Sequence, residues 1–324
     1  MPIRNTTAIE SILSWYSKAG DPGLLTLAQR KCHDVLSRKW AFGQGVKIRL
    51  SSRRRKMSDL RFRLHNNETL FGVFAKSNDP FFIEIIGKAG FDFVILDTEH
   101  GPNSPRDLYP LVLASEASGL LPVVRVAALS EAEIIHALDI GIAGIQIPHL
   151  SNVNEAMKAV ELSRFWPDGS RGVCKFVRAA DFSLKDPHDY FEEANRVAVI
   201  GMVEGVEGIK NFDKILEVGG IDVFFIGPYD LSQSLGVIGD INNPRVCEGV
   251  SAIVAKCKAQ NRAVGTFVDN FESAMRYMDL GVQFLAYSVD VGIFAEACRT
   301  INNELRRIRL ESDRISQNKD TADV

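Results

Sequence analysis

From residue 69 onward, the chain alternates short apolar runs with longer amphipathic segments. The apolar runs are rich in Val, Ile and Phe, and they are continuous rather than alternating, which is typical of strands buried on both faces of a parallel sheet. The pattern predicts eight strands: Leu70–Ala75, Phe91–Leu96, Leu121–Val126, Gly144–Ile147, Val197–Val203, Val223–Ile226, Ala263–Phe267 and Phe284–Tyr287.

The segments between these runs begin with residues that favour helix starts. Asp79 and Ser104 each precede a proline, so that an N-cap side chain is followed by a proline at the first helical position. Ser130 and Glu133 have the spacing of a capping box. Further N-cap candidates and helix-ending glycines occur at the other junctions: Ser151, Asn211, Asn243, Asp269 and Asp290, with Gly90, Gly119, Gly141, Gly219 and Gly281.

Eight strands that are each followed by a helix, over about 250 residues, predict an α/β fold of the (β/α)8 TIM-barrel type. An open, doubly wound sheet is the alternative, although it ordinarily uses fewer strands at this length. The turn after the first strand, Phe74–Ser77, contains neither a P-loop nor a G-x-G-x-x-G pattern. The sequence therefore predicts no phosphate loop at that turn.

The two ends of the chain differ from the predicted barrel. Residues 1–56 lack clear periodicity and hold 12 of the 38 Lys and Arg residues but only 3 of the 41 Asp and Glu residues. We expect a basic, poorly ordered extension over 1–56, the barrel over 57–310 and a polar tail over 311–324. A transit or regulatory segment and a packed structural segment are the alternatives for residues 1–56.

Composition limits the classes of function. No window approaches 18 consecutive apolar residues, so we expect no membrane span. Residues 57–324 carry 26 basic and 38 acidic side chains, a charge that would repel nucleic acid. The five cysteines are scattered without a C-x-x-C pair, which fits a reducing compartment. We therefore expect a cytoplasmic protein, with import into an organelle by the basic N-terminus as the alternative.

Polar residues stand at the ends of two predicted strands, which is where (β/α)8 barrels carry their chemistry. The second strand is followed at once by Asp97, Thr98, Glu99 and His100. This cluster is either catalytic or a hydrogen-bonded corner. The third strand ends in Arg125, and a buried guanidinium needs an anionic partner, either a carboxylate of the protein or one of a ligand.

Two carboxylates stand at the ends of neighbouring strands further along the chain. Glu204 ends the fifth strand, and Asp230 follows the sixth. Because close carboxylates repel each other, one of them is protonated or a cation lies between them. Oxygen ligands with open coordination positions favour Mg²⁺ or Mn²⁺ over zinc. Two separately solvated carboxylates at the rim are the alternative.

Other candidate residues give weaker signals. His136 lies inside a predicted helix, and we expect it to be a surface or packing residue. His149 follows the fourth strand, and it either lines the site or caps the strand. Cys174 has no neighbour in the sequence that would activate its thiolate.

Several separated motifs lie at or near the strand ends: Gly90–Asp92 with Leu96–His100, Pro122–Val126, Ser170–Val173, Glu204 and Phe225–Ser232. Together they resemble the HpcH/HpaI family of class II, metal-dependent 2-oxo acid aldolases, over roughly residues 60–308. The resemblance implies a barrel of the phosphoenolpyruvate/pyruvate-binding type. It also implies a lyase that reversibly cleaves a 4-hydroxy-2-oxo acid to pyruvate, or a related 2-oxo acid, and an aldehyde.

The resemblance assigns catalytic roles to five positions. Glu204 and Asp230 correspond to the ligands of a divalent cation, which is Mg²⁺, Mn²⁺ or Co²⁺. His100 corresponds to the general base, oriented by Asp139. Arg125 corresponds to the residue that contacts the oxo group of the bound 2-oxo acid.

The resemblance also implies supporting residues. Asp97 and Glu99 match positions near the water ligands of the metal. The turn formed by Gly227, Pro228 and Tyr229 matches a loop whose backbone N–H groups hold the substrate carboxylate. Met202 departs from the pattern, because several family members have Gln two residues before the metal-binding Glu.

Two rival functions stay open. A relative that cleaves acyl-CoA thioesters of hydroxy-dicarboxylic acids uses a similar barrel and metal pair, but the sequence has no obvious basic surface for CoA. A non-catalytic barrel that serves in binding or assembly would be expected to lose the polar strand-end residues, which this chain retains.

The last predicted helix, Asp290–Ile308, carries apolar residues at a helical spacing. This apolar stripe either closes the chain's own barrel or packs on a neighbouring subunit. The family resemblance implies a homo-oligomer, commonly a trimer of dimers.

Overall fold

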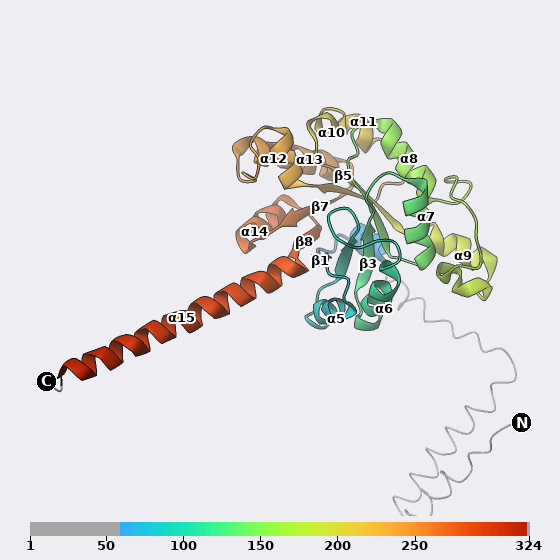
Figure 1. Ribbon diagram of the computed structural model, residues 1–324. Helices are drawn as coiled ribbons and strands as arrows, with labels where there is room; N and C mark the ends of the chain where they lie inside the picture. The colour runs from blue at the N-terminus through green and yellow to red at the C-terminus, as the bar shows by residue number, and fades with distance from the viewer. Residues whose placement is uncertain (1–58, 323–324) are drawn as a thin grey trace, which may run out of the picture. The chain divides into compact units, whose positions relative to one another are not determined.

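A computed structural model of the chain describes residues 59–322, with side chains up to residue 312. The predicted extension over 1–56 lies outside the described residues. Eight parallel strands close into a barrel in the order of the sequence (Figure 1). The strands are β1 (Leu70–Ala75), β2 (Phe93–Asp97), β3 (Leu121–Arg125), β4 (Gly144–Ile147), β5 (Ala198–Val203), β6 (Val223–Ile226), β7 (Ala263–Val268) and β8 (Phe284–Val289).

Helices follow every strand and surround the barrel, which confirms the predicted (β/α)8 fold. The helical segments are α4 (Leu60–His65), α5 (Pro80–Lys88), α6 (Leu108–Ser118), α7 (Glu131–Ile140), α8 (Val153–Ser163), the 3-10 segment η2 (Arg178–Ser183), α9 (Pro187–Ala194), α10 (Val206–Lys210), α11 (Phe212–Leu216), α12 (Pro228–Ser234), α13 (Pro244–Ala259), α14 (Phe271–Leu280) and α15 (Asp290–Ala322). No helix among residues 59–322 is long and apolar enough to span a membrane.

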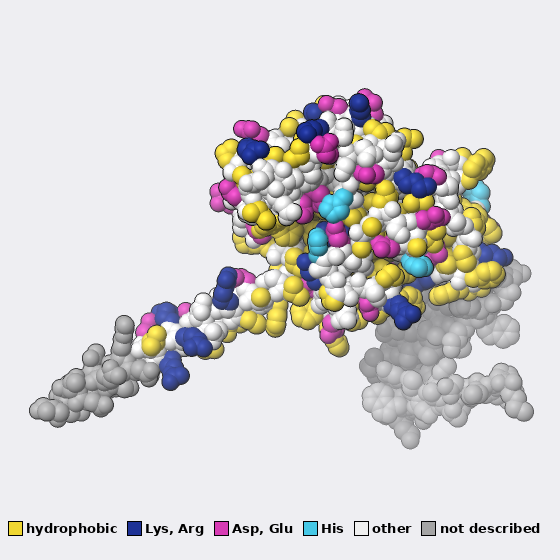
Figure 2. All heavy atoms as spheres, turned by 45° about the horizontal axis from the view of Figure 1, so that its top comes forward, with side chains coloured by type: hydrophobic (Ala, Val, Ile, Leu, Met, Phe, Trp, Pro, Cys, Tyr) yellow, Lys and Arg dark blue, Asp and Glu magenta, His cyan; other side chains and the backbone are white. Residues whose placement is uncertain are grey.

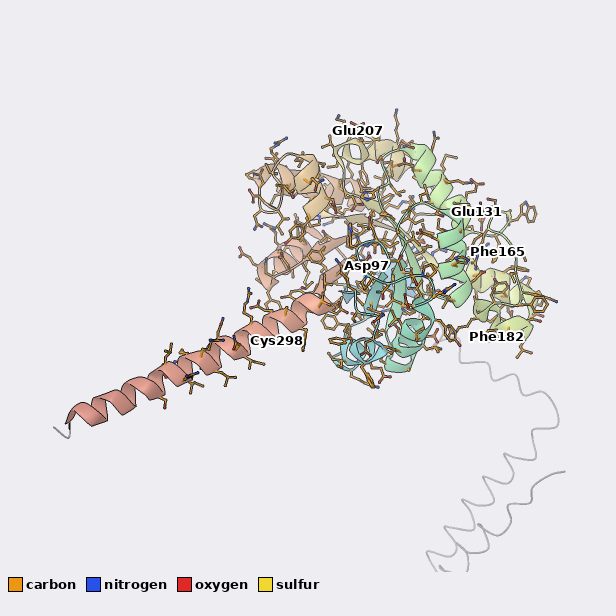
Figure 3. All side chains as sticks on the ribbon, in the orientation of Figure 1. Asp97, Glu131, Phe165, Phe182, Glu207 and Cys298 are labelled. Atoms are coloured by element: carbon orange, nitrogen blue, oxygen red, sulfur yellow. The ribbon has the colours of Figure 1, made fainter. Side chains whose placement is uncertain are left out.

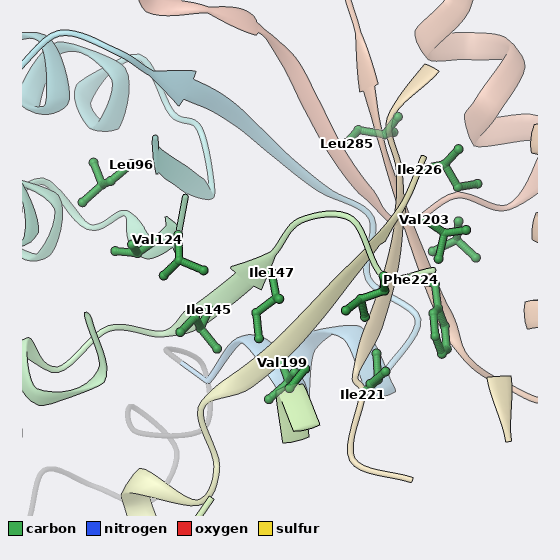
Figure 4. Close-up of a cluster of buried hydrophobic side chains, with 14 of the residues drawn as sticks. Leu96, Val124, Ile145, Ile147, Val199, Val203, Ile221, Phe224, Ile226 and Leu285 are labelled. Carbon is green, nitrogen blue, oxygen red and sulfur yellow. The ribbon is translucent and has the colours of Figure 1, made fainter. Parts of the chain in front are cut away.

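The strands bury both faces, so the core has two layers. Outward-facing residues such as Val124 and Val199 pack between the sheet and the helices (Figure 4). Inward-facing residues fill the barrel, where the rings of Phe93 and Phe284 stack with their centroids 3.8 Å apart. Gly72 is required beside them, because a Cβ at this position would lie 2.2 Å from the Phe93 ring.

The two ends of the barrel are built differently. At the end where the strands begin, Leu60 and Leu64 of α4 join the inner apolar cluster and close the barrel. A Cβ at Gly144 would lie 3.1 Å from a Leu60 methyl carbon, so that helix packs directly under β4. The opposite end, where the strands finish, carries the polar residues predicted from the sequence.

The connection between α8 and β5 is a long excursion with its own small core. Phe165 and Tyr190 are buried together there, in a cluster apart from the barrel core. Arg171 stacks over the Phe165 ring, with its guanidinium carbon 4.5 Å from the ring centroid. Its Nη2 atom lies 2.7 Å from Asp139 Oδ1, which joins the excursion to α7.

Several predicted helix signals are confirmed. Asp79 accepts a hydrogen bond from the backbone N–H of Phe81. Asn243 caps α13 in the same manner. Gly119, Gly141 and Gly281 end their helices in the left-handed conformation that glycine adopts without strain.

Asn152 and Asn270 cap α8 and α14, rather than the preceding Ser151 and Asp269 that the sequence suggested. Two further predicted caps differ in detail. α6 begins after Asp107 rather than after Ser104, and both the backbone N–H and the hydroxyl of Ser104 donate to the Asp107 carboxylate. Ser130 precedes α7 but makes no capping hydrogen bond. Glu133 instead accepts hydrogen bonds from backbone N–H groups of the loop after β3. In both cases a carboxylate satisfies loop donors that sequence spacing alone does not reveal.

The last helix, α15, leaves the barrel and runs far beyond it (Figure 1). Its side chains are exposed from residue 291 to residue 312. The helix continues past residue 310, where the sequence predicted a tail, and ends at Ala322. Hydrophobic side chains lie along the part nearest the barrel (Figure 2).

Candidate active site

A cavity of about 290 Å³ opens where the strands end. It contains the predicted residues His100, Arg125 and Asp230, together with the turn that begins at Gly227. Histidine and acidic side chains gather near the middle of the face drawn in Figure 2. A larger cavity of about 790 Å³ is lined by residues around the strand starts and contains none of the predicted site residues. The residues that line the smaller cavity are Phe74, Lys76, His100, Arg125, Met202, Phe225, Gly227, Pro228, Tyr229, Asp230, Phe267 and Val289.

Arg125 is buried and paired with carboxylates of the protein. Its Nε and Nη2 atoms donate to the two carboxylate oxygens of Asp97, at 2.9 and 2.7 Å. Its Nη1 atom lies 2.9 Å from Glu99 Oε2. The sequence left open whether the anionic partner of Arg125 is a carboxylate of the protein or one of a ligand. The structure shows carboxylates of the protein. A guanidinium has five N–H donors, so these contacts leave others that can face the cavity.

Asp97 also organises the loop that carries His100. Its Oδ1 atom accepts the backbone N–H groups of Glu99 and His100, at 3.0 and 3.3 Å. Burial raises the pKa of Asp97, but the hydrogen bonds and charge of Arg125 outweigh that effect and lower it. Asp97 is therefore an ionised anchor near the centre of the barrel (Figure 3).

His100 lies beside this anchor with its imidazole half exposed. Its Nε2 atom is 4.0 Å from Glu99 Oε1, the nearest carboxylate contact of the ring. The Asp139 carboxylate is bound to Arg171 instead, and within residues 59–322 it makes no hydrogen bond to His100. The structure thus places His100 at the cavity, and it places Asp139 in the contact between α7 and the excursion.

His149 contacts two of the carboxylates near the cavity. Its Nδ1 atom lies 2.9 Å from Glu204 Oε1, and its Nε2 atom lies 3.0 Å from Glu99 Oε1. Its backbone N–H donates to Glu204 Oε1 as well, from a residue with φ of 58°. The hydrogen bond and charge of Glu204, with the charges of Glu99 and Asp230, raise the pKa of His149 to about 9.

Glu204 is buried against the turn that carries Asp230. A Cβ at Gly227 would lie 2.6 Å from Glu204 Oε2, so only glycine lets this turn approach the carboxylate so closely. Asp230 is the third residue of α12, which begins directly after Gly227. The nearby Tyr229 donates its hydroxyl hydrogen to Asp269, at 2.6 Å, and burial with this contact raises the pKa of Tyr229 to about 12.

The charges around the cavity do not balance. Three cations, Arg125, Lys76 and protonated His149, face four carboxylates: Asp97, Glu99, Glu204 and Asp230. Burial raises the pKa of Glu99, and the charge of Glu204 raises it further against the opposing effect of Arg125. The carboxylates around the cavity therefore outnumber these cations by one. Among residues 59–322, no group of three or more His, Cys, Asp or Glu side chains could hold a metal ion, so a cation here would rely on water or substrate for further ligands.

Sequence reasoning missed two polar residues near the site. Gln146 is fully buried on β4, beside Arg125 in the strand register, and neither polar atom of its amide has a partner in the described part of the chain. Lys76 directly follows β1 and lines the cavity. Gln146 interrupts the apolar strand β4, and Lys76 follows the end of β1. The search for polar residues at strand ends that found Arg125 would therefore have found Lys76 as well.

Known proteins match most of the chain. The 5-keto-4-deoxy-D-glucarate aldolase of Enterobacter sp. is 33% identical over 74% of this chain and 93% of its own length. A crystal structure of an HpcH/HpaI aldolase/citrate lyase family protein from Burkholderia cenocepacia is 35% identical, with a TM-score of 0.73, over 76% of this chain and 98% of that one. The crystal structure of the citrate synthase SbnG is 32% identical, with a TM-score of 0.70, over 79% and 99% of the two chains.

The model of the HpcH/HpaI aldolase/citrate lyase family matches residues 70–297. This match begins at β1 and ends in α15, so it spans the complete barrel. It confirms the resemblance seen in the sequence motifs, and with it the prediction of a carbon–carbon lyase. The chain belongs to the HpcH/HpaI aldolase/citrate lyase family.

Proposed function

We propose that the enzyme cleaves a 4-hydroxy-2-oxo acid reversibly to pyruvate, or a related 2-oxo acid, and an aldehyde. The observation that carries the proposal is the uncompensated group of carboxylates beside a fixed guanidinium at the cavity. Aldol cleavage leaves negative charge on the carbon next to a ketone and on the ketone oxygen. Fixed positive charge at that oxygen is the largest stabilisation that a protein usually supplies.

We further propose that Glu204 and Asp230 hold a divalent cation, which is Mg²⁺, Mn²⁺ or Co²⁺. Two carboxylates are a small ligand set, and Mg²⁺ commonly combines one or two carboxylates with water and substrate oxygens. The excess of carboxylates over cations around the cavity supports this assignment. When bound, such a cation supplies Lewis-acid stabilisation to the carboxylate and keto oxygens of the substrate.

Arg125 would direct its remaining N–H donors at the keto oxygen of the substrate. Its ion pairs with Asp97 and Glu99 hold the guanidinium in one orientation, so no reorganisation is needed as charge develops. Met202 lines the cavity near it and offers no hydrogen bond of this kind. Gly227, Pro228 and Tyr229 form the opposite wall, where we place the substrate carboxylate.

His100 would remove the proton of the 4-hydroxyl group as the C3–C4 bond breaks, directly or through a water molecule. Its exposed imidazole lies in the cavity wall, and histidine is the side chain that most often serves as a general base. In the synthetic direction it would remove a proton from the methyl group of pyruvate. The orienting role expected of Asp139 would require that carboxylate to leave Arg171.

A metal-dependent substrate screen tests this function. The enzyme is stripped with a chelator and then assayed with a series of 4-hydroxy-2-oxo acids, with released pyruvate coupled to lactate dehydrogenase. We expect pyruvate only after Mg²⁺, Mn²⁺ or Co²⁺ is restored. Trapping of a pyruvate imine on the protein by borohydride would contradict the proposal, because it would indicate a lysine Schiff base.

A second carbon–carbon lyase reaction is supported by one observation, the similarity to a citrate synthase. That class includes reactions that pass through the enolate of an acyl-CoA thioester, and Arg125, with a cation that the same carboxylates would hold, would stabilise such an enolate. Malyl-CoA and citramalyl-CoA therefore belong in the same screen. Turnover of a CoA thioester without turnover of any 4-hydroxy-2-oxo acid would favour this alternative.

We also propose that the protein is a homo-oligomer in the cytoplasm. The apolar residues of α15 are exposed in the single chain, and a second copy is the partner that would cover them: Val291, Phe294, Ile301, Leu305 and Ile308. The four cysteines of the described residues are free thiols, which fits a reducing compartment. Light scattering of the wild type and of an Ile301→Asp/Leu305→Asp variant tests the assembly, and a monomeric wild type would contradict it.

A further inference from the structure

Gln146 is a polar residue inside the barrel, next to the proposed site. It lies on β4 between Ile145 and Ile147, which both belong to the outer apolar layer (Figure 4). Because side chains alternate along a strand, Gln146 points into the barrel. Its register partner on β3 is Arg125, and its register partner on β5 is Ile200. Gln146 is therefore the strand neighbour of the residue that we assign to the keto oxygen of the substrate.

The amide of Gln146 is buried without a partner. The residue is 0% exposed, and within residues 59–312 neither Oε1 nor Nε2 makes a hydrogen bond. Other buried polar side chains of the barrel are paired: Asp97 accepts from Arg125, and the Thr266 hydroxyl donates to the carbonyl oxygen of Ile226. A buried amide without hydrogen bonds destabilises the fold, because it has lost its contacts with water. The packing of the barrel therefore gives no reason for an amide at this position.

Two residues that line the cavity flank Gln146. Arg125 lies beside it on β3. On β5, Met202 follows Ile200 by two residues and also faces the barrel interior, so it stands one step nearer the mouth than Gln146. The thioether side chain of methionine has several rotatable bonds and adapts readily to its surroundings. A rotation of Met202 is therefore a small change that would open the floor of the cavity toward the amide.

We infer that Gln146 is a binding residue for the 2-oxo acid, and this inference rests on the proposed function. Its Nε2 atom donates to an oxygen of the bound 2-oxo acid when Met202 turns aside, while Arg125 directs its own donors at the keto oxygen. A 2-oxo acid carries three oxygen acceptors, and an apolar side chain at this position could not donate to any of them. The amide therefore weakens the fold and strengthens the complex, so its removal should have effects of opposite sign on stability and on binding.

The stability of the protein without ligand is the first test. Gln146→Met keeps the length of the side chain and removes the amide, and its urea midpoint without metal should equal or exceed that of the wild type, because no hydrogen bond is lost. Asn103→Leu is the matched contrast. This buried amide donates to the carbonyl oxygens of Lys76 and Asp97, so its removal should lower the midpoint. A midpoint of Gln146→Met as low as that of Asn103→Leu would overturn the inference, since the amide would then have a partner in the unliganded protein.

Binding of oxalate to the Mn²⁺-loaded protein, measured by calorimetry, is the second test. Oxalate is a small planar anion that stands in for the 2-oxo acid. We expect Gln146→Met to raise the Kd of oxalate roughly 10- to 100-fold, as the loss of a hydrogen bond to a charged group does. Gln260→Met removes an exposed amide at the end of α13 and should leave that Kd unchanged. An unaltered Kd in Gln146→Met would overturn the inference.

Exchange of the pyruvate methyl protons with deuterated water separates this inference from the proposed function. We expect Gln146→Met to raise the KM for pyruvate in this exchange by about the same factor as the Kd of oxalate and to change kcat less. Exchange in the wild type that depends on metal and on His100, with an unaltered KM in Gln146→Met, refutes the role of Gln146 alone. Absence of exchange in the wild type refutes the proposed function and, with it, the ligand assigned to Gln146.

Discussion

The two sides of the barrel mouth differ in how their charges are satisfied. On the β2–β3 side, Arg125 is held between Asp97 and Glu99, and the resulting ion pairs are almost fully buried. On the β5–β6 side, His149 is the one cationic partner that Glu204 has among residues 59–312, and Asp230 adds a further negative charge. On the first side the cation is fully paired within the protein, and on the second side the carboxylates outnumber the single histidine that faces them.

This difference distinguishes residues that hold the site in shape from residues that bind a ligand. Buried charges that are matched in the protein fix the shape of a site, because breaking such a pair leaves an uncompensated charge. Buried charges that are not matched mark the place where a cation or an ionic ligand lowers the energy. Substitutions on the two sides should therefore have different consequences for activity and for stability.

The largest effect is expected from Glu204→Gln. Loss of a ligand for the proposed cation should lower kcat/KM on the order of 10⁴-fold, the equivalent of several kcal/mol of Lewis-acid stabilisation. Calorimetric titration with Mn²⁺ should show weaker binding in the same variant. Glu207→Gln, which changes an exposed carboxylate on α10, is the matched control. Wild-type activity in Glu204→Gln would remove the metal site from the mechanism.

His100→Ala should have the next largest effect. General acid–base groups contribute roughly 10²- to 10⁴-fold to the rate, so kcat for the cleavage should fall by such a factor. His136→Ala serves as control, because this histidine is exposed on α7. If pyruvate proton exchange were as fast in His100→Ala as in the wild type, another residue would be the base.

Asp97→Asn should destabilise the protein, whereas Glu204→Gln should not. Removing the charge of Asp97 leaves Arg125 without its main partner, and we expect the free energy of unfolding to fall by about 3 kcal/mol. Glu204→Gln keeps a hydrogen-bond acceptor for His149 and should change that free energy by less than about 1 kcal/mol. Urea unfolding without metal measures both, and equal losses would refute the contrast.

The pH dependence of the same two variants sharpens the contrast. The pKa of Asp97 is lowered in the folded protein, so its contribution is present above its ordinary value of 3.8 and is lost as the pH falls through its folded pKa. The steep loss of stability in acid should therefore be weaker in Asp97→Asn. Identical acid unfolding profiles would argue against an ionised Asp97 in the fold.

The smallest effect is expected from His149. Its pKa is raised from 6.5 to about 9, so its contribution to stability is present below pH 6.5 and is lost as the pH rises through 9. The imidazole is largely exposed, and solvent screening limits the contribution to a fraction of 1 kcal/mol. Melting temperatures of the wild type and His149→Phe between pH 6 and 10 measure it, and parallel curves would contradict the prediction.

Much of the fold was predictable because each strand is a continuous apolar run bounded by polar loops. Three of the eight predicted strands, Leu70–Ala75, Gly144–Ile147 and Val223–Ile226, have the observed bounds, and the others differ by one or two residues at an end. Ser104 does not cap α6, and Ser130 precedes α7 without a capping hydrogen bond, because the carboxylates of Asp107 and Glu133 accept hydrogen bonds from nearby loop N–H groups. Local spacing does not reveal such contacts.

The sequence by itself determined the barrel, the family and the short set of polar residues at the strand ends, since these follow from periodicity and from motifs along the chain. Only the tertiary structure decided which of these residues face one another. It paired Asp139 with Arg171, placed His149 between Glu99 and Glu204, and left Lys76 facing the cavity. The reason is geometric: closing the barrel brings together residues as far apart as Lys76 and Asp290, 214 positions along the chain, and their distances depend on the turns between them.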